Sequence, residues 1–205
     1  MAEFDHIVVI APDLAAGLDH VEAAIGVRLP KGGSHPLMGT HNHLVRLGEA
    51  AFLEVIAVDP DAPAPARPRW FTLDHRPDRP RLAHWVVRTT DMAGLHPALP
   101  TSSGPALRVT RGDLHWLLTV PEDGSLPEGG TFPSLIEWGN SPLPPRAMPG
   151  AGLELRRLVL SHPDPAHLQG LLSGVIDDPR VEVAAGQAPA LAALIQTPEG
   201  PKWLE

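Results

Sequence analysis

Two histidines and two glutamates stand alone within stretches of apolar, strand-like sequence. His6 and His84 lie near the starts of two such stretches, and Glu54 and Glu137 lie within two later ones. Burying an isolated carboxylate is costly unless it is paired, protonated or bound to a cation. Two imidazoles and two carboxylates suit a divalent transition ion such as Zn²⁺, Ni²⁺, Mn²⁺ or Fe²⁺. We therefore expect these four residues to form one metal site, if the fold brings them together.

Three further histidines are candidate substrate-binding residues. His41 and His43 are two residues apart, so they share one face of a strand. His115 is a plausible counterpart in the second half of the chain. These histidines line the same cavity, or they are polar surface positions. Trp85 and Trp138 directly follow proposed ligands, so alternation predicts that both point to the opposite face.

The positioning elements are indicated by an internal repeat. The segment 4–14 aligns with the segment 82–92, which places His6 on His84 and Asp13 on Asp91. Each segment is a β-rich run followed by an Asp suited to capping a helix. A third match, at 155–165, has Arg157 at the histidine position.

Each repeat start is followed by a helix-like stretch and then by strand-like stretches. An apolar stripe with helical spacing runs from Leu14 to Ile25 and ends at Gly26. The spacing predicts strands over 27–29, 43–47 and 51–58 in the first repeat. In the second it predicts a helix over 91–99 and strands over 107–110, 114–120 and 134–138. In the third it predicts a helix over 165–176 and strands over 181–184 and 191–196.

The predicted fold class is α+β, with paired βαβββ modules forming a cupped mixed sheet and a third, partial module beside it. The first module spans 1–59, the second 81–140, and the third, an abbreviated βαββ module, 152–205. Proline-rich linkers over 60–80 and 141–151 separate them, because proline blocks strand extension. The first linker is expected to carry a short helical turn near Trp70 to Leu73, packed through its aromatic residues.

The composition limits the classes of partner. Lys plus Arg number 16 and Asp plus Glu number 24, which gives a formal net charge of −8. An acidic chain without basic runs predicts no nucleic-acid or anionic-membrane partner. No apolar run is long enough to span a bilayer. Cysteine is absent, which excludes disulfides and thiol chemistry, so we expect a cytoplasmic protein.

Several stretches resemble the vicinal oxygen chelate superfamily, and within it the glyoxalase-like domain proteins. They are DHIVVIAPDL at the start, HPLMGTHNHLVRLG followed by AFLEVIAVDP, and later LIEWG. The resemblance covers roughly residues 4 to 140. It implies chelation of a small molecule through adjacent oxygens, with the metal stabilising an enolate-like anion.

The second glutamate and the absence of tyrosine favour a glyoxalase-like arrangement over a dioxygenase. The resemblance then implies a metal-dependent isomerase or lyase in which Glu54 or Glu137 transfers the proton. The alternative is a metal-free protein of the same fold that binds or sequesters a small molecule. A third option is a structural role in dimerisation alone. A homodimer is compatible with each of them.

Overall fold

The computed structural model describes residues 1–205. The first module begins with β1 (Glu3–Ile10) and α1 (Leu14–Ile25), followed by β2 (Lys31–His35), β3 (Thr40–Arg46) and β4 (Phe52–Val58). The Asp13 side chain accepts a hydrogen bond from Ala16 N and so caps α1. Gly26 ends the helix in the left-handed conformation, with φ 75°. The predicted start and end of this helix are therefore confirmed.

The second module repeats this order with a shorter helix. Its elements are β5 (Arg81–Arg88), α2 (Met92–Leu95), β6 (Ala106–Arg111), β7 (Leu114–Thr119) and β8 (Ser134–Glu137). Short 3₁₀ turns η2 (His96–Ala98) and η3 (Thr101–Ser103) follow α2, and η4 (Pro127–Gly130) lies between β7 and β8. The first linker contains the expected helical turn, η1 (Trp70–His75), whose Trp70, Phe71 and Leu73 are buried.

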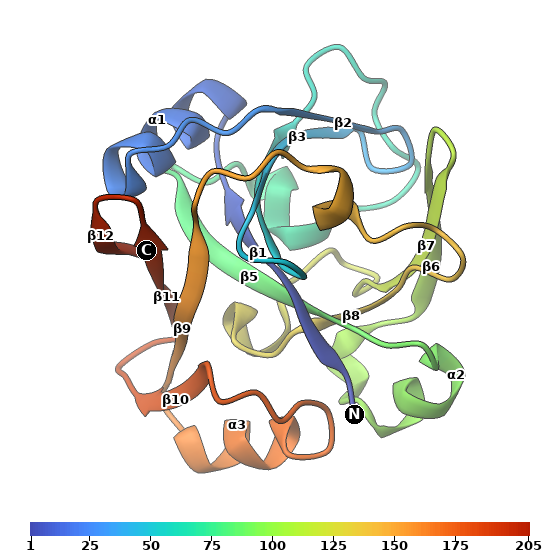
Figure 1. Ribbon diagram of the computed structural model, residues 1–205. Coiled ribbons are helices and arrows are strands. Elements are labelled where there is room, and N and C mark those ends of the chain that lie inside the picture. Colours follow the sequence, from blue (N-terminus) through green and yellow to red (C-terminus); the bar gives the residue numbers. More distant parts are fainter.

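The two modules share one sheet of eight strands in the order β2-β3-β4-β1-β5-β8-β7-β6. The first strands of the modules, β1 and β5, pair antiparallel at the centre, and each pairs in parallel with the last strand of its own module. The sheet curls so that its two edges, β2 and β6, come into contact. The predicted α+β class and cupped sheet are confirmed (Figure 1).

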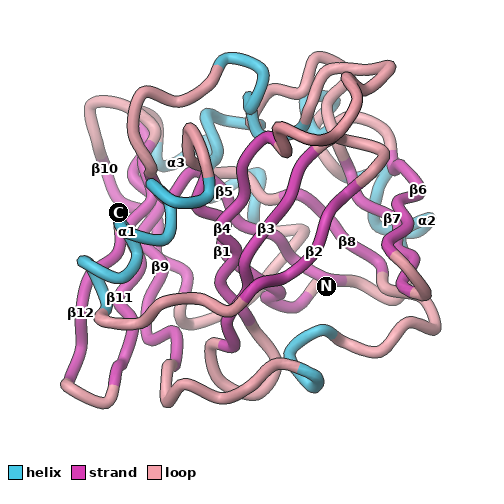
Figure 2. The backbone as a smooth tube through the Cα atoms, turned by 90° about the horizontal axis from the view of Figure 1, so that it is seen from above, coloured by secondary structure: helices cyan, strands magenta, loops and turns pink.

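The C-terminal unit forms a separate sheet. It consists of β9 (Glu154–His162), α3 (Pro165–Leu172), β10 (Val181–Ala185), β11 (Ala190–Thr197) and β12 (Gly200–Leu204), in the order β10-β9-β11-β12. It therefore has one strand more than the abbreviated unit expected from sequence. Its first strand, β9, pairs with β10 and β11, the first two strands after α3, whereas β1 and β5 each pair with the last strand of their own module. Figures 1 and 2 show this unit beside α1, on the side away from the β6–β7 hairpin.

Two hydrophobic clusters cover the two faces of the large sheet. The larger lies between the sheet, α1 and the C-terminal unit, and includes Leu53 and Val55 of β4. The smaller fills the concave face and includes Phe52 and Ile56 from the same strand. Because both faces are covered, β4 is buried along nearly its whole length. No helix is long and apolar enough to cross a membrane.

Candidate functional site

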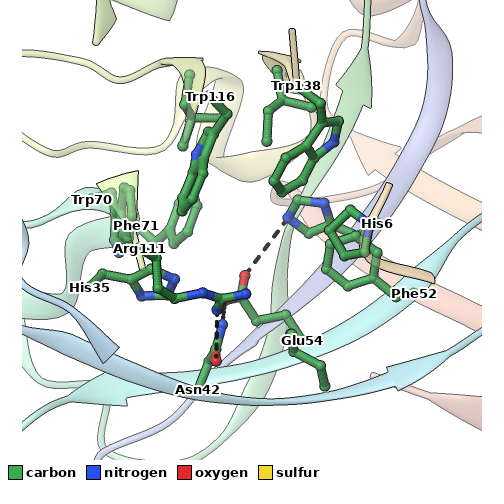
Figure 3. Close-up of a pocket in the computed structure, with 14 residues that line it drawn as sticks. His6, His35, Asn42, Phe52, Glu54, Trp70, Phe71, Arg111, Trp116 and Trp138 are labelled. Atoms are coloured by element: carbon green, nitrogen blue, oxygen red, sulfur yellow. Dashed lines mark hydrogen bonds and ion pairs between the residues drawn. The ribbon is translucent and has the colours of Figure 1, made fainter. Parts of the chain in front are cut away.

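The concave face of the large sheet holds a cavity lined by both modules and both linkers. Its volume is about 40 Å³, within a recess of about 440 Å³ counted out to its open mouth. Figure 3 shows Trp116 and Trp138 on one side of the cavity and Asn42, Glu54 and Arg111 on the other. The residues that line it are His6, His35, Asn42, Leu44, Phe52, Glu54, Trp70, Phe71, Arg111, Trp116, Leu118, Ile136, Trp138 and Pro144.

His6 is held on the cavity wall by its sequence neighbour. A β-bulge between Phe4 and His6 interrupts the alternation of β1. Asp5 and His6 are both buried, and His6 Nδ1 lies 2.6 Å from Asp5 Oδ1. The other carboxylate oxygen of Asp5 accepts a hydrogen bond from Trp138 Nε1 at 3.0 Å. Asp5 therefore fixes the orientation of both rings.

Glu54, on β4, lies next to His6 on the same face of the sheet. Its Oε1 accepts a hydrogen bond from Asn42 Nδ2 at 2.6 Å, and its Oε2 lies 3.7 Å from His6 Nε2. The Glu54 side chain is only 8% exposed. Asn42 is fixed in turn, because its Oδ1 accepts a hydrogen bond from Gly33 N at 2.8 Å. Asp5, His6, Glu54 and Asn42 thus form a continuous polar row along an otherwise apolar wall.

His84 lies on the same face but does not join this row. Its Nε2 accepts hydrogen bonds from Ser134 N (3.2 Å) and Ser134 Oγ (2.9 Å), which leaves the ring proton on Nδ1, 3.2 Å from Gly130 O. Phe71 packs against it, with ring centroids 5.2 Å apart. Burial lowers the pKa of His84 to about 3, so the ring is neutral. With both nitrogens engaged, His84 has no free donor atom.

Glu137 points to the opposite face of the sheet. Its Oε2 accepts a hydrogen bond from Met92 N at 2.6 Å, at the start of α2. The strand register gives the reason. Val8, two residues after His6, pairs with Glu54, whereas Val86, two residues after His84, pairs with Ser134. The position equivalent to Glu54 is therefore Ser134.

The three other candidate histidines lie outside the cavity. His41 and His43 share a face, as expected, but it is the outer face of β3, where His43 Nδ1 lies 2.8 Å from Leu29 O. His115 is exposed. Asn42, which lies between His41 and His43, and Trp116, which follows His115, line the cavity instead.

The two tryptophans that follow proposed ligands differ from each other. Trp85 is fully buried in the larger cluster, as predicted, and donates its indole N–H to Thr131 O at 2.9 Å. Trp138 lines the cavity, contrary to expectation, because Glu137 before it points outward. The ring of Trp138 lies 5.3 Å from that of Trp116, and the two rings form one end of the cavity.

His35 is a cavity residue that the sequence did not indicate. Burial is the main cause that lowers its pKa to about 3, and the charges of Arg111, His41 and His6 add to the effect. Its ring meets Trp70 edge-on at 5.1 Å, and its Nδ1 lies 3.1 Å from Thr40 Oγ1. His35 is therefore a neutral wall of the cavity.

The side chains present do not fit the predicted four-ligand metal site. His6 and Glu54 adjoin each other, whereas the hydrogen bonds of His84 engage both its nitrogens and Glu137 lies on the other face. No group of three or more His, Asp or Glu side chains is placed to hold a metal ion. What remains is a histidine and a carboxylate, with Asp5 behind one and Asn42 behind the other.

Comparison with known proteins gives a match to a family model described as a glyoxalase-like domain, over residues 4–176. No curated protein matches the chain. Among solved structures, a hypothetical protein from Staphylococcus aureus gives a TM-score of 0.63 at 13% identity, covering 96% of this chain and 91% of that one. At this identity the likeness shows a shared fold over nearly the whole chain, including the C-terminal unit.

Two further structural matches are weaker. Methylmalonyl-CoA epimerase from Mycobacterium tuberculosis gives a TM-score of 0.45 at 16% identity, covering 68% of this chain and 89% of that one. The Streptomyces coelicolor enzyme of the same name, in complex with 2-nitronate-propionyl-CoA, gives 0.44 at 14% identity, covering 69% and 99%.

Proposed function

Because the chain belongs to the glyoxalase-like domain family, of the vicinal oxygen chelate superfamily, we propose that it is an isomerase or lyase that transfers a proton within a small molecule. The cavity on the concave face is its site, and His6 and Glu54 are its acid–base pair. The observation that carries the proposal is the buried row Asp5–His6–Glu54, in which His6 Nε2 faces the Glu54 carboxylate at 3.7 Å.

Each member of the row has a defined part. Glu54, as the carboxylate, removes a proton from a carbon next to a carbonyl, and the electron pair moves onto the carbonyl oxygen. His6, as the imidazolium whose Nδ1–H is held by Asp5, then returns a proton from Nε2 to carbon while the electron pair moves back from the oxygen, which completes the isomerisation. The short gap between the two residues lets the proton pass back from Glu54 to His6. Asp5 and Asn42 are positioning residues.

The apolar walls support this chemistry by limiting water. Phe52 stacks on His6 with ring centroids 4.2 Å apart, and Ile136 and Trp138 are both less than a tenth exposed. Charged groups interact more strongly where water is displaced. No step requires a metal ligand set, in keeping with the placement of His84 and Glu137.

A second candidate is a binding protein that sequesters its ligand without reaction. The observation in its favour is the aromatic lining, in which Trp70, Trp116 and Trp138 surround the cavity. Stacking on such rings would hold a planar ligand without any acid–base step. Under this alternative, Glu54 serves only to hold Asn42.

Deuterium incorporation separates the two candidates. The protein, with EDTA present, is incubated in D₂O with a panel of small ketones and 2-oxo acids, and the protons next to the carbonyl are followed by NMR. We expect exchange above the uncatalysed rate for at least one compound. Stable binding of panel members with no acceleration of exchange by any of them would favour the binding protein.

A further inference from the structure

Arg111 is a cavity residue whose charge has no partner. It is the last residue of β6, at the turn into β7, and its side chain lines the cavity across from Trp116 and Trp138 (Figure 3). Its guanidinium takes part in none of the ion pairs of the protein and makes a single long hydrogen bond, 3.5 Å from Nη1 to Asn42 Oδ1. A guanidinium offers five N–H donors in a planar fork. Most of that capacity is unused.

A glycine in β2 leaves space for the Arg111 side chain. Arg111 crosses the edge of β2 at Gly33, where a Cβ would lie 3.0 Å from Arg111 Cδ. A side chain at position 33 would therefore press on the arginine. Asn42 contacts both the guanidinium and the acid–base row, because its Oδ1 accepts from Arg111 Nη1 at 3.5 Å while its Nδ2 donates to Glu54. The guanidinium and the acid–base row are thereby held in a fixed relation.

The wall beside Arg111 adds a second unused donor. Trp70 is 3% exposed, and its indole N–H has no hydrogen-bond acceptor. Buried donors are rarely left without a partner in native proteins. His35, whose ring lies 5.1 Å from that of Trp70, is uncharged, so Arg111 is the positive charge at this end of the cavity. Two side chains at this end, Arg111 and Trp70, therefore carry N–H donors that lack an acceptor.

Resting on the proposed function, we propose that the substrate carries a carboxylate, which Arg111 binds in bidentate fashion, on a planar apolar body that lies against Trp116 and Trp138. The class is therefore a small carboxylic acid with a carbonyl near the His6–Glu54 pair. A planar carboxylate matches the guanidinium fork. The cavity volume of about 40 Å³ is small, so the body of the ligand extends toward the mouth of the recess.

Binding of simple probes tests the inference without any turnover. Phenylacetate, its uncharged methyl ester, and benzylphosphonate are titrated into ¹⁵N-labelled protein, and dissociation constants are read from the indole N–H signals. We expect phenylacetate to bind at least about tenfold more tightly than the ester, as charged hydrogen bonds imply. The Trp70 indole signal should move with the acid.

Three variants make the assignment specific. Arg111→Gln should abolish the preference for acid over ester while leaving ester binding within about twofold, and Arg111→Lys should retain part of it. Arg108→Gln is the matched control, because Arg108 is exposed on the same strand. Equal affinity for acid and ester, an unchanged preference in Arg111→Gln, tighter binding of benzylphosphonate, or binding of no probe would each overturn the inference.

The test distinguishes this inference from the proposed reaction. Glu54→Gln should keep the preference for the acid, because Glu54 is not the anion ligand, while proton exchange is lost. Acid preference in a protein that catalyses no exchange would support the substrate class and refute the reaction. Exchange without acid preference would support the reaction and refute the substrate class.

Discussion

His6 Nε2 and Glu54 Oε2 lie 3.7 Å apart on neighbouring parallel strands. His6 pairs with Phe52, and Glu54 pairs with Val8, so the two side chains are diagonal neighbours on the concave face of the sheet. Each has a second, closer partner, Asp5 for His6 and Asn42 for Glu54. Asp5 and Asn42 therefore hold the pair from its two ends, and the pair faces the cavity.

Removing either member of this pair should stop proton transfer. We expect Glu54→Gln and His6→Asn each to lower the rate of deuterium exchange about 10²- to 10⁴-fold, the usual contribution of a general acid or base. Exchange is followed by NMR in D₂O under saturating substrate. His115→Asn, an exposed histidine, is the matched control and should retain the full rate. Retention of the rate in both site variants would refute the acid–base assignment.

Glu137 should behave unlike Glu54, although both stand in similar sequence. Its carboxylate accepts a hydrogen bond from Met92 N and carries negative charge at the start of α2. We expect Glu137→Gln to leave exchange within about twofold of the natural protein and to cost up to about 1 kcal/mol of stability, the range for a charge at a helix terminus. Urea unfolding and the exchange assay measure the two effects. A loss of activity as large as that of Glu54→Gln would restore Glu137 to the site.

The contrast between these two glutamates shows what the sequence could predict. The repeat that aligns His6 with His84 identified the modules, their order and the cupped sheet. It also identified His6 and Glu54 as cavity residues. Hydrophobic alternation could not assign the faces of β8, because both faces of the sheet are covered and Ser134, Leu135 and Ile136 are all buried. A shift of one residue in such a strand exchanges its two faces.

Other site residues lacked any local signal. Asp5 reaches His6 only because of a β-bulge, which the sequence does not mark. Arg111 and Trp70 enter from a hairpin end and a linker turn, whose positions depend on closure of the whole sheet. A signal did exist for Asn42 and Trp116. Each adjoins a histidine that was a candidate for the cavity, and the surface alternative for those histidines would have turned both Asn42 and Trp116 into the cavity.

Divalent metal ions should have little effect on stability. A specific site that binds only the native state adds about 2.7 kcal/mol when the free metal is at 100 times its dissociation constant. Because His84 and Glu137 are engaged elsewhere, we expect Zn²⁺, Ni²⁺, Mn²⁺ and Fe²⁺ to shift the melting temperature by less than about 1 °C, well below the several degrees that such a gain would produce. Thermal unfolding with EDTA as reference measures this. A large increase that disappears in both His6→Asn and Glu54→Gln would demonstrate a metal site.

Stability should fall as the pH is lowered from 7.5 to 5, because His35 and His84 are buried without charge. Burial lowers the pKa of each to about 3, whereas in the unfolded chain it is near 6.5. The unfolded state therefore binds more protons between these values, and the stabilisation present above pH 6.5 is progressively lost below it. pH 5 lies about 1.5 units below the pKa of an unfolded histidine, and one unit corresponds to about 1.4 kcal/mol. Each histidine should therefore lower the free energy of unfolding by about 2 kcal/mol at pH 5. Urea unfolding at the two pH values measures the difference.

His84→Gln should reduce the pH dependence by about half, although it also lowers stability at pH 7.5 by disturbing the hydrogen bonds to Gly130 and Ser134. His115→Asn should show the full dependence. Equal stability at pH 7.5 and pH 5 would mean that these two rings are not buried in the neutral form.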